Sequence, residues 1–498
     1  MWLAAIHWEL VLVLSAQAVL SARLLGANTA FNAEAIYLDV GRLETAHLLH
    51  GAAVPAFPTY VSGVPVIYPP IAAMVNALGG LAAARAFSLI CVLGATMLLW
   101  AVTSRLFGRW AGFLAAGSWA MLGPTLHLAS FATCDAFALL LLTTATWCVL
   151  HVGDEHDAAS WMFAGGSALA LANAALYPSI LFDPVVVALA LFGAFPKPGG
   201  KRGLTRAGMV VAQTGLLGML LLKLDGKHYV ANLSAVARSL ARGDSSVAAP
   251  LLISWAWIGV LAVVAFAAVA LSFFDRLTGG QRAMLLVLGV AAALAPIEQT
   301  RLHTSTSLNQ YADYGAWFAA IAVGYFGGRL ATSAKPRLLR RAMSAGLVGL
   351  LAMLAVLGAR QATRMTTTWP GAARLTAFLQ PRTSHGGRFL ADTHSVLEYY
   401  LPDTSWRQWS DTVGLTLRSG RGASKTGGAT AYINALKHHY FSLVVLSFTS
   451  MPGVDREITE VLSSVKGYRL IRKVPFSGTK PGYFTVWAYS GPAGQARE

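Results

Sequence analysis

The sequence predicts an all-α polytopic membrane protein with a small C-terminal α/β domain. Hydrophobic residues make up 55% of the 498 residues and charged residues only 12%, whereas a soluble domain is usually about a quarter charged. Many apolar runs approach the ~18 residues that indicate a membrane-spanning helix. After about residue 361 the apolar runs shorten and charged residues return. We therefore expect a transmembrane domain over residues 1–360 and a soluble domain over residues 361–498.

About 11 membrane spans are expected in the first domain. The first apolar run has neither a basic segment before it nor a clear small-residue cleavage site, so it is interpreted as a retained helix rather than a signal peptide. With a cytoplasmic N-terminus, the short cytoplasmic loops hold 13 lysines and arginines and the longer outer loops hold 8, as the positive-inside rule requires. The C-terminal domain is then extracytoplasmic. The expected spans are 6–24, 83–103, 110–124, 134–150, 160–176, 179–195, 207–222, 251–273, 283–297, 311–328 and 340–359.

The first outer loop is expected to run from about residue 25 to residue 82. Within it, the helical spacing of Leu43, Ala46, His47 and His50 predicts an amphipathic helix over 39–50 that lies at the membrane interface. Prolines then recur up to Pro70, and they favour an extended chain after this helix.

The C-terminal domain is predicted from alternating strand-like and helix-like segments. Strands are expected at GRFLADTH, FSLVVLSF, YRLIRKVPF and YFTVWAY, and helices at 369–379, 430–438 and 456–465. The three cysteines, Cys91, Cys134 and Cys148, lie in or beside apolar runs without metal-ligand spacing. They are interpreted as small apolar core residues.

Acidic residues are scarce, and those on the outer side are the candidates for catalysis. Glu34, Asp39 and Glu44 lie in the first outer loop, and Asp135 opens the fourth span. A carboxylate can act as a general base that deprotonates an acceptor hydroxyl, and an ionisable residue at a span is a functional candidate. For Asp39 the alternatives are a solvated loop carboxylate or a helix N-cap, and for Asp135 the alternative is a helix N-cap. For Glu34 the alternative is a plain loop residue, and for Glu44 it is a helix-face ion pair.

Basic residues on the outer side are unexpected under the positive-inside rule. Arg85, Lys227, Arg301 and His303 would be explained by a phosphate ligand, which such side chains bind through charge-assisted hydrogen bonds. The alternative is anchoring to anionic lipid headgroups. Carboxylates and cations at one interface indicate transfer of a group from a polyprenyl phosphate. Glu44, Tyr68 and Gln310 are expected to complete the pocket that these carboxylates and cations form.

Residues 1–330 resemble the GT-C superfamily of polyprenyl-phosphate-sugar-dependent glycosyltransferases, and most closely its protein O-mannosyltransferase and aminoarabinose transferase branch. The likeness rests on an acidic first loop ending in Gly51, on Tyr68-Pro69-Pro70 with Gly79-Gly80 and AAARAFS after it, on the turn RLFGRWAG, and on Asp135. In that family a first-loop acid is the catalytic base, and the reaction inverts the anomeric carbon. Asp39, about twelve residues before the loop glycine, takes this role here. Many members have two adjacent acids where this chain has isolated ones, so Glu34 is a rival base.

The expected function is therefore an inverting, mannosyltransferase-like glycosyltransferase at the outer face of a bacterial plasma membrane. Its expected partners are a polyprenyl-phosphate-linked sugar donor, a glycan, lipid or protein acceptor, and membrane lipids, without nucleic acid. No cofactor is assigned, but the family includes members with and without divalent ions, so magnesium or manganese stays open. The alternatives are a transporter or flippase for a lipid-linked substrate, for which the inverted repeats typical of transporters are not seen, and a non-catalytic cell-envelope scaffold.

Overall fold

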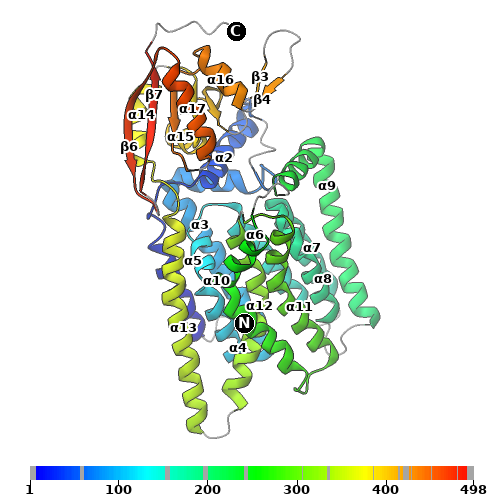
Figure 1. Ribbon diagram of the computed structural model, residues 1–498. Helices are drawn as coiled ribbons and strands as arrows, with labels where there is room; N and C mark the ends of the chain where they lie inside the picture. Colours follow the sequence, from blue (N-terminus) through cyan, green and yellow to red (C-terminus); the bar gives the residue numbers. More distant parts are fainter. Residues whose placement is uncertain are drawn as a thin grey trace. The chain divides into compact units, whose positions relative to one another are not determined.

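The computed structural model describes most of the chain, in two compact units (Figure 1). One unit, which we call the helical unit, comprises residues 1–25 and 56–363, and the other, the sheet unit, comprises residues 26–55 and 364–498. The described residues are 7–55, 61–151, 157–193, 200–240, 245–305, 307–333, 337–384, 386–412, 416–418, 425–427, 429–449, 451–478 and 481–490.

The helical unit contains a helix at each of the expected spans. Among the described residues, six helices are long and apolar enough to cross a membrane, which confirms a multi-pass membrane protein. The number of eleven spans stays a prediction. The helices are α1 (Trp8–Ala22), α3 (Tyr68–Phe107), α4 (Arg109–Ala120), α5 (Gly123–Leu128), α6 (Cys134–His151), α7 (Ala158–Ala175), the 3₁₀ helix η3 (Tyr177–Phe182), α8 (Asp183–Phe192), α9 (Gly200–Leu240), α10 (Ala248–Ser272), α11 (Gly279–Arg301), α12 (Leu308–Ser333) and α13 (Arg337–Thr366).

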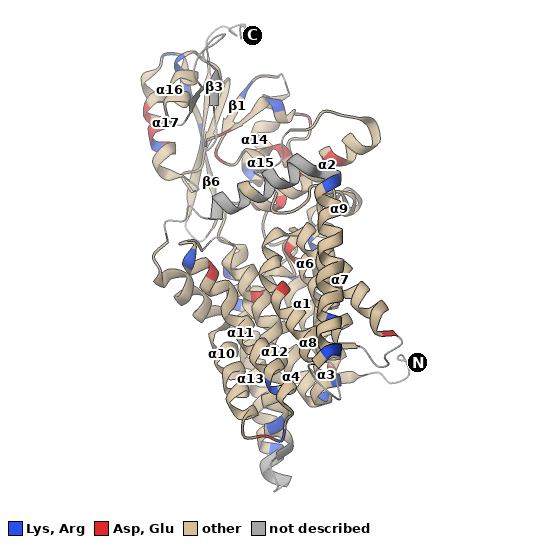
Figure 2. Cartoon of the chain, turned by 90° about the vertical axis from the view of Figure 1, so that its right-hand side faces the viewer, with Lys and Arg blue, Asp and Glu red and all other residues tan. Residues whose placement is uncertain are grey.

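Helix α12 is central to the helical unit, because it packs against α3, α4, α10 and α11. Nearly every side chain from Ala312 to Ala322 is buried. Gly315 lies so close to the backbone of Ala291 on α11 that an added Cβ would come within 2.4 Å of its carbonyl oxygen. Figure 2 shows lysines and arginines gathered at one end of the unit, near α3 and α4, with few in the middle of the helices.

The expected extended chain at Tyr68-Pro69-Pro70 is wrong, since these residues begin α3. Proline is tolerated in the first turn of a helix, where its missing N–H would have no helical partner. Helix α3 then bends at Gly79-Gly80, where Gly80 takes a φ of 66° that glycine adopts without steric cost. The bend lies just before residue 83, where the second span is expected to begin.

Two connections in the helical unit also follow from local sequence. The tight turn expected at RLFGRWAG is confirmed: Gly108, with a φ of 89°, separates α3 from α4. The loop expected after residue 222 is wrong, because α9 continues to Leu240.

The sheet unit contains a five-stranded sheet of order β2-β1-β5-β7-β6 and a separate β3–β4 hairpin. Strands β2, β1 and β5 are parallel, and β7 pairs antiparallel with β5 and β6. The four expected strands and three expected helices are confirmed, while α15, β2 and the hairpin were not predicted. The elements are α2 (Asn32–His50), α14 (Ala373–Thr383), β1 (Phe389–Ala391), α15 (His394–Tyr400), the 3₁₀ helix η4 (Trp406–Gln408), β2 (Trp409–Asp411), β3 (Thr416–Arg418), β4 (Lys425–Gly427), α16 (Ala429–Lys437), β5 (Leu443–Leu446), α17 (Pro452–Ser464), β6 (Tyr468–Phe476) and β7 (Gly482–Tyr489).

Both faces of the sheet are covered. Along β5, Leu443 and Val445 belong to one core with α14 and α15, whereas Val444 and Leu446 belong to a second core with α16 and α17. This alternation follows from the two-residue period of a strand. Because β5 is buried on both faces, its sequence is a continuous apolar run.

Helix α2 begins at Asn32, seven residues before the predicted amphipathic helix. Residues 26–55 fold with the C-terminal unit, although we expected them in a loop of the helical domain. Asn28 Nδ2 donates to the carbonyl oxygens of Thr366 and Trp369, and Trp369 Nε1 donates to that of Thr29. These bonds tie the segment before α2 to the last residue of α13 and to the segment that follows it.

Candidate functional site

The predicted base Asp39 lies in the middle of α2 and is buried, with 7% of its surface exposed. Arg42, one turn further along the helix, donates to Asp39 Oδ1 from Nε at 3.1 Å and from Nη2 at 2.7 Å. Among the described residues no donor reaches the other oxygen, Oδ2. Asp39 is therefore held through one oxygen and keeps a second oxygen to accept a proton.

Three ionisable side chains from the C-terminal part of the chain lie near Asp39. His394 and Glu398 lie on α15, which packs against α2, and Asp411 ends β2. Both α15 residues interact electrostatically with Asp39 and with Asp411. None of the three was predicted, and the only signal in the sequence was two ionisable residues within the short segment THSVLEYY.

Burial sets the charge of the two α15 side chains. Burial raises the pKa of Glu398 to about 8. The charges of Asp39 and Asp411 raise this pKa further, whereas the charge of Arg42 lowers it. Burial also lowers the pKa of His394, against the opposing effects of Asp411 and Asp39. At neutral pH both groups are therefore uncharged, so neither α15 side chain adds a charge beside Asp39.

Three polar residues lie at the carboxyl ends of the parallel strands. Asp411 ends β2, Asp392 follows β1 and Ser447 follows β5. Asp392 Oδ2 accepts from the backbone N–H of Ser447 at 3.0 Å and from its hydroxyl. In open α/β sheets, ligands bind beyond the carboxyl ends of the strands. The α2–α15 pair thus lies beside the part of such a sheet where a ligand site is expected.

The other two first-loop acids also lie on α2. Glu34 is fully buried in its first turn, and its Oε2 accepts the backbone N–H of Phe31 at 2.9 Å. This contact satisfies one of the unpaired N–H groups at the helix start. Glu44 is buried to 8% exposure. The roles expected for Glu34 as rival base and Glu44 as pocket residue stay predictions.

Asp135 lies in the first turn of α6 in the helical unit and is buried to 5% exposure. Its Oδ2 accepts the hydroxyl of Thr133 at 2.7 Å. Its backbone carbonyl accepts the hydroxyl of Tyr314 on α12, and Tyr311 lies near enough to interact electrostatically with it. The alternative that Asp135 is the N-cap of this helix is wrong, because α6 begins at Cys134 and Asp135 is its second residue.

A second buried carboxylate, Asp313, lies on α12 and was given no role from sequence. Its Oδ1 accepts the hydroxyl of Thr125 at 2.6 Å, and its backbone carbonyl accepts Trp119 Nε1 at 3.2 Å. Among the described residues no donor reaches Oδ2, although that atom is buried. Its signal in the sequence was an acid within the apolar run that forms a span.

Of the three predicted phosphate ligands whose side chains are described, Arg85 is the most deeply buried. It is fully buried near the start of the second part of α3, and its Nη1 donates to the carbonyl oxygen of Leu25 at 2.8 Å. His127 on α5 is buried and lies close enough to interact electrostatically with Arg85. A buried pair of nitrogen-rich side chains suits an anionic ligand, and His127 was not predicted.

The other predicted cations have different surroundings. Arg301 is exposed and paired with Glu298, from Nη2 to Oε1 at 2.6 Å. His303 is exposed, and its Nδ1 lies 3.3 Å from the carbonyl oxygen of Ser245. Lys227 lies in α9, and its side chain is outside the described residues.

Tyr68 and Gln310, the remaining pocket residues, are both buried in the helical unit. Tyr68 packs near the rings of Phe87 and Phe137, at centroid distances of 6.5 and 6.2 Å. Asp39, Glu34 and Glu44 belong to the sheet unit. That the two groups of residues share one cavity stays a prediction. Among the described residues there is no group of three or more His, Cys, Asp or Glu that could hold a metal ion.

Comparison with known proteins gives a family match within the helical unit. The family model of dolichyl-phosphate-mannose-protein mannosyltransferase matches residues 64–222, a stretch that includes α3, Arg85 and Asp135. No curated protein sequence matches the chain.

Several solved structures share the fold along nearly the whole chain. ArnT from Cupriavidus metallidurans, bound to undecaprenyl phosphate, has a TM-score of 0.63 at 14% identity and covers 98% of this chain and 100% of its own. The oligosaccharyltransferase of Archaeoglobus fulgidus has a TM-score of 0.56 at 13% identity, covering 96% of this chain and 74% of its own. Mycobacterial arabinofuranosyltransferase AftD has a TM-score of 0.58 at 11% identity, and the match covers 98% of this chain and 42% of AftD. The resemblance expected from the sequence is thus confirmed at the level of fold: the chain is similar in fold to ArnT, an archaeal oligosaccharyltransferase and an arabinofuranosyltransferase, and part of it matches the family model of a mannosyltransferase.

Proposed function

We propose that this protein is an inverting glycosyltransferase that moves a sugar from a polyprenyl-phosphate donor to an acceptor hydroxyl. The observation that carries the proposal is the state of Asp39. It is buried on α2, held through Oδ1 by Arg42, and has an Oδ2 atom that accepts no hydrogen bond from the described residues. A carboxylate held in this way suits a general base.

In the proposed reaction, the acceptor hydroxyl oxygen attacks the anomeric carbon of the donor sugar while Asp39 takes its proton. The bond from the anomeric carbon to the phosphate oxygen breaks, and polyprenyl phosphate leaves with the electron pair. Attack from the side opposite the leaving group inverts the anomeric carbon. Arg85 is proposed to stabilise the negative charge that develops on the phosphate.

The donor class is supported by what similar proteins bind. ArnT of Cupriavidus metallidurans has been solved with undecaprenyl phosphate, and the archaeal oligosaccharyltransferase with dolichol phosphate and, separately, with a tethered acceptor peptide. The matching family model describes a mannosyltransferase. We propose a hexosyl or pentosyl donor, with mannose as the first to test, and a glycan, lipid or protein acceptor.

The proposed location is the outer face of a bacterial plasma membrane, with the N-terminus in the cytoplasm. Lysines and arginines concentrate in the short connections that this orientation assigns to the cytoplasm. A soluble unit at the C-terminal end of the chain would then meet extracytoplasmic acceptors.

The test is transfer of label from radioactive polyprenyl-phosphate sugars by membranes that contain the protein. Membranes with the wild type should form a labelled product, and membranes with Asp39→Asn at the same protein level should form far less. Equal labelling by the two membranes would contradict the proposal. Movement of intact labelled donor across the membrane without a glycosylated product would instead favour the transporter alternative.

A further inference from the structure

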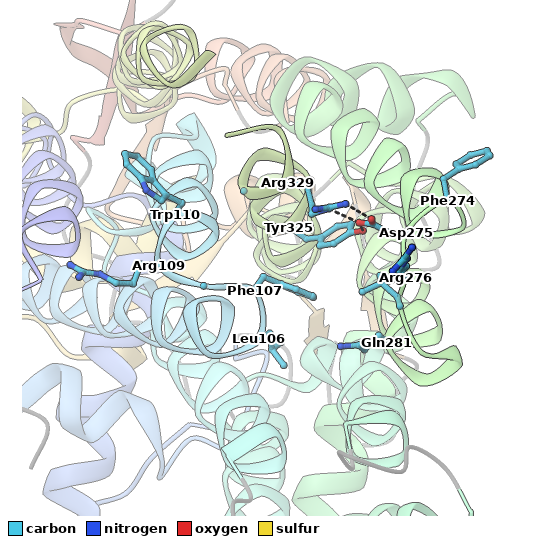
Figure 3. A pocket seen from close by; sticks show the side chains of 13 residues that line it. Leu106, Phe107, Arg109, Trp110, Phe274, Asp275, Arg276, Gln281, Tyr325 and Arg329 are labelled. Atoms are coloured by element: carbon cyan, nitrogen blue, oxygen red, sulfur yellow. Dashed lines mark hydrogen bonds and ion pairs between the residues drawn. The ribbon is translucent and has the colours of Figure 1, made fainter. Parts of the chain in front are cut away.

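A polar pocket lies at the end of the helical unit to which the positive-inside rule assigns the cytoplasm. It has a volume of about 660 Å³. Three segments form it: the turn between α3 and α4, the connection between α10 and α11, and the end of α12 (Figure 3). This volume lies within the range of small-ligand sites. The proposed glycosyl transfer makes no use of it.

Each of the three segments contributes one arginine to the pocket, namely Arg109, Arg276 and Arg329. Two of them are paired. Arg329 donates to both oxygens of Asp275, through Nε at 2.6 Å and through Nη2. Arg109 Nη2 donates to both oxygens of Glu9, at 2.9 and 3.0 Å. The paired guanidiniums are therefore largely neutralised.

Arg276 differs from the other two arginines. Among the described residues, it has no hydrogen bond and no ion pair. It lies next to Asp275, whose carboxylate is already used by Arg329 and by the hydroxyl of Tyr325. These two donors hold the pKa of Asp275 below its usual value, so Asp275 remains an anion committed to them. The positive charge of Arg276 is thus not compensated within the described part of the pocket.

The loop that presents Arg276 is fixed by its own contacts. Arg282 Nε donates to the carbonyl oxygen of Ser272 and Nη2 to that of Asp275, each at 3.1 Å. The bonds from Arg329 and Tyr325 to Asp275 fix the loop against α12. The backbone that carries Arg276 is thus fixed, so only the arginine side chain has to be ordered when an anion binds.

Exposed aromatic residues flank the pocket. Phe273 and Phe274 are 63% and 88% exposed, and Trp110 is 45% exposed. Figure 3 shows the side chain of Phe274 directed away from Asp275 and Arg276. Aromatic side chains at the ends of membrane helices lie at the level of the lipid headgroups. An anion with an apolar part, such as a lipid, would therefore meet aromatic surface beside Arg276, whereas free phosphate would make no use of it.

We propose that this pocket binds the headgroup phosphate of an anionic phospholipid, with Arg276 as its main ligand and the acyl chains against Phe273 and Phe274. Basic pockets between membrane helices are typical sites for anionic lipid headgroups. An unpaired guanidinium provides up to five N–H donors for phosphate oxygens. The site is independent of the donor site, since it shares no residue with it.

Native mass spectrometry of the full-length protein in detergent tests the proposal, with dioleoyl phosphatidylglycerol and dioleoyl phosphatidylcholine as probes. The wild type should retain one phosphatidylglycerol more tightly than phosphatidylcholine. Arg276→Gln should weaken that retention by about tenfold or more, because a hydrogen bond to a charged group is lost. Arg341→Gln is the matched control: it removes one exposed arginine from α13, outside the pocket, and should stay within about twofold of the wild type.

Three outcomes would overturn the inference. The first is equal retention of phosphatidylglycerol by Arg276→Gln and Arg341→Gln, and the second is equal affinity of the wild type for the two lipids. The third is complete displacement of phosphatidylglycerol by inorganic phosphate at the same concentration, which would make the ligand a soluble phosphate group. Since Arg276 is exposed, its replacement should leave the fold and the melting temperature unchanged, and this is measured on the same samples.

Discussion

Arg42 donates two hydrogen bonds to a single oxygen of Asp39, from Nε at 3.1 Å and from Nη2 at 2.7 Å. The carboxylate is thereby fixed through Oδ1, and no donor among the described residues reaches Oδ2. A general base needs such an oxygen, because it must receive the proton that leaves the acceptor hydroxyl. The pair thus separates the oxygen that positions the group from the oxygen that reacts.

Replacing Asp39 with Asn should nearly abolish sugar transfer. Asn has the size of Asp, and its amide oxygen can still accept from Arg42, but it cannot take a proton at this step. Turnover of labelled polyprenyl-phosphate sugar should fall by ~10²–10⁴-fold, the range typical of a lost general base. Expression and donor binding should stay near wild type.

The controls for Asp39→Asn are the same change of charge at the two other α2 acids. Glu44 lies five residues further along α2, about 140° round the helix, so Glu44→Gln should cost far less. Full activity of Asp39→Asn together with loss of activity in Glu34→Gln would make Glu34 the base. If neither replacement matters, α2 does not hold the base.

Replacing Arg42 with Gln should lower the turnover number more than it changes the Michaelis constant for the acceptor. Arg42 is half exposed, and exposed ion pairs contribute only ~0.2–1 kcal/mol. A two- to fivefold loss of kcat is therefore expected, about what such an energy corresponds to. Arg42→Lys keeps the charge but loses the two-donor fork, so its kcat should lie between those of the wild type and Arg42→Gln. A change in KM alone would assign Arg42 to acceptor binding instead.

Replacing Glu398 with Gln should flatten the pH dependence of stability. The pKa of Glu398 is raised to about 8, so between pH 4.5 and 8 it stays protonated when folded and ionises when unfolded. The wild type therefore loses stability as the pH rises through this window, and levels off above it. Gln is neutral at every pH, so the Glu398→Gln variant lacks this pH-dependent contribution to stability. A difference of 1 kcal/mol corresponds to about 2–4 °C in Tm for a unit of this size.

Thermal unfolding of both proteins in detergent from pH 5 to pH 9 measures this effect. The drop in Tm should be smaller for Glu398→Gln than for the wild type. Asp455, whose pKa burial raises to about 7, contributes a slope of the same sign in both proteins, so the comparison is between the two slopes. Equal slopes would show that Glu398 is ionised in the folded protein.

Donor binding should depend most on Arg85 among the four predicted cations. Arg85→Gln should weaken binding of the polyprenyl-phosphate donor by about tenfold or more, because charged hydrogen bonds contribute ~1.5–3 kcal/mol each. Arg85→Lys keeps the buried positive charge, so it is the control that separates loss of donor binding from loss of folding. Arg301→Ala should weaken binding less, since Arg301 is exposed and paired with Glu298. Unchanged affinity in the variants of Arg85, Lys227, Arg301 and His303 would leave lipid anchoring as their role.

The C-terminal end of the chain should lie outside the cytoplasm. A reporter that is active only in the cytosol, fused after Glu498, should give no signal in cells. The same reporter fused after Lys335, in a loop assigned to the cytoplasm, is the positive control. Activity of the fusion after Glu498 would reverse the predicted orientation.

The sequence by itself determined the fold class and the position of most helices. A membrane helix needs a long apolar run, and the expected spans each coincide with a helix, because that requirement is local. The strands of the sheet unit were predicted for the same reason, since β5 is an unbroken apolar run buried on both faces. Asp39, Asp135 and Arg85 were selected as candidate site residues because charged residues are rare in a chain of this composition.

Only the tertiary structure decided which residues surround Asp39. His394, Glu398 and Asp411 are more than 350 residues away along the chain, and nothing in their local spacing relates them to α2. Their proximity arises from packing of α15 against α2 and from the order β2-β1-β5 in the sheet. Long-range packing depends on the fit of whole surfaces, which a linear pattern does not contain. For the same reason the raised pKa of Glu398 follows from its burial among distant charges rather than from its neighbours in sequence.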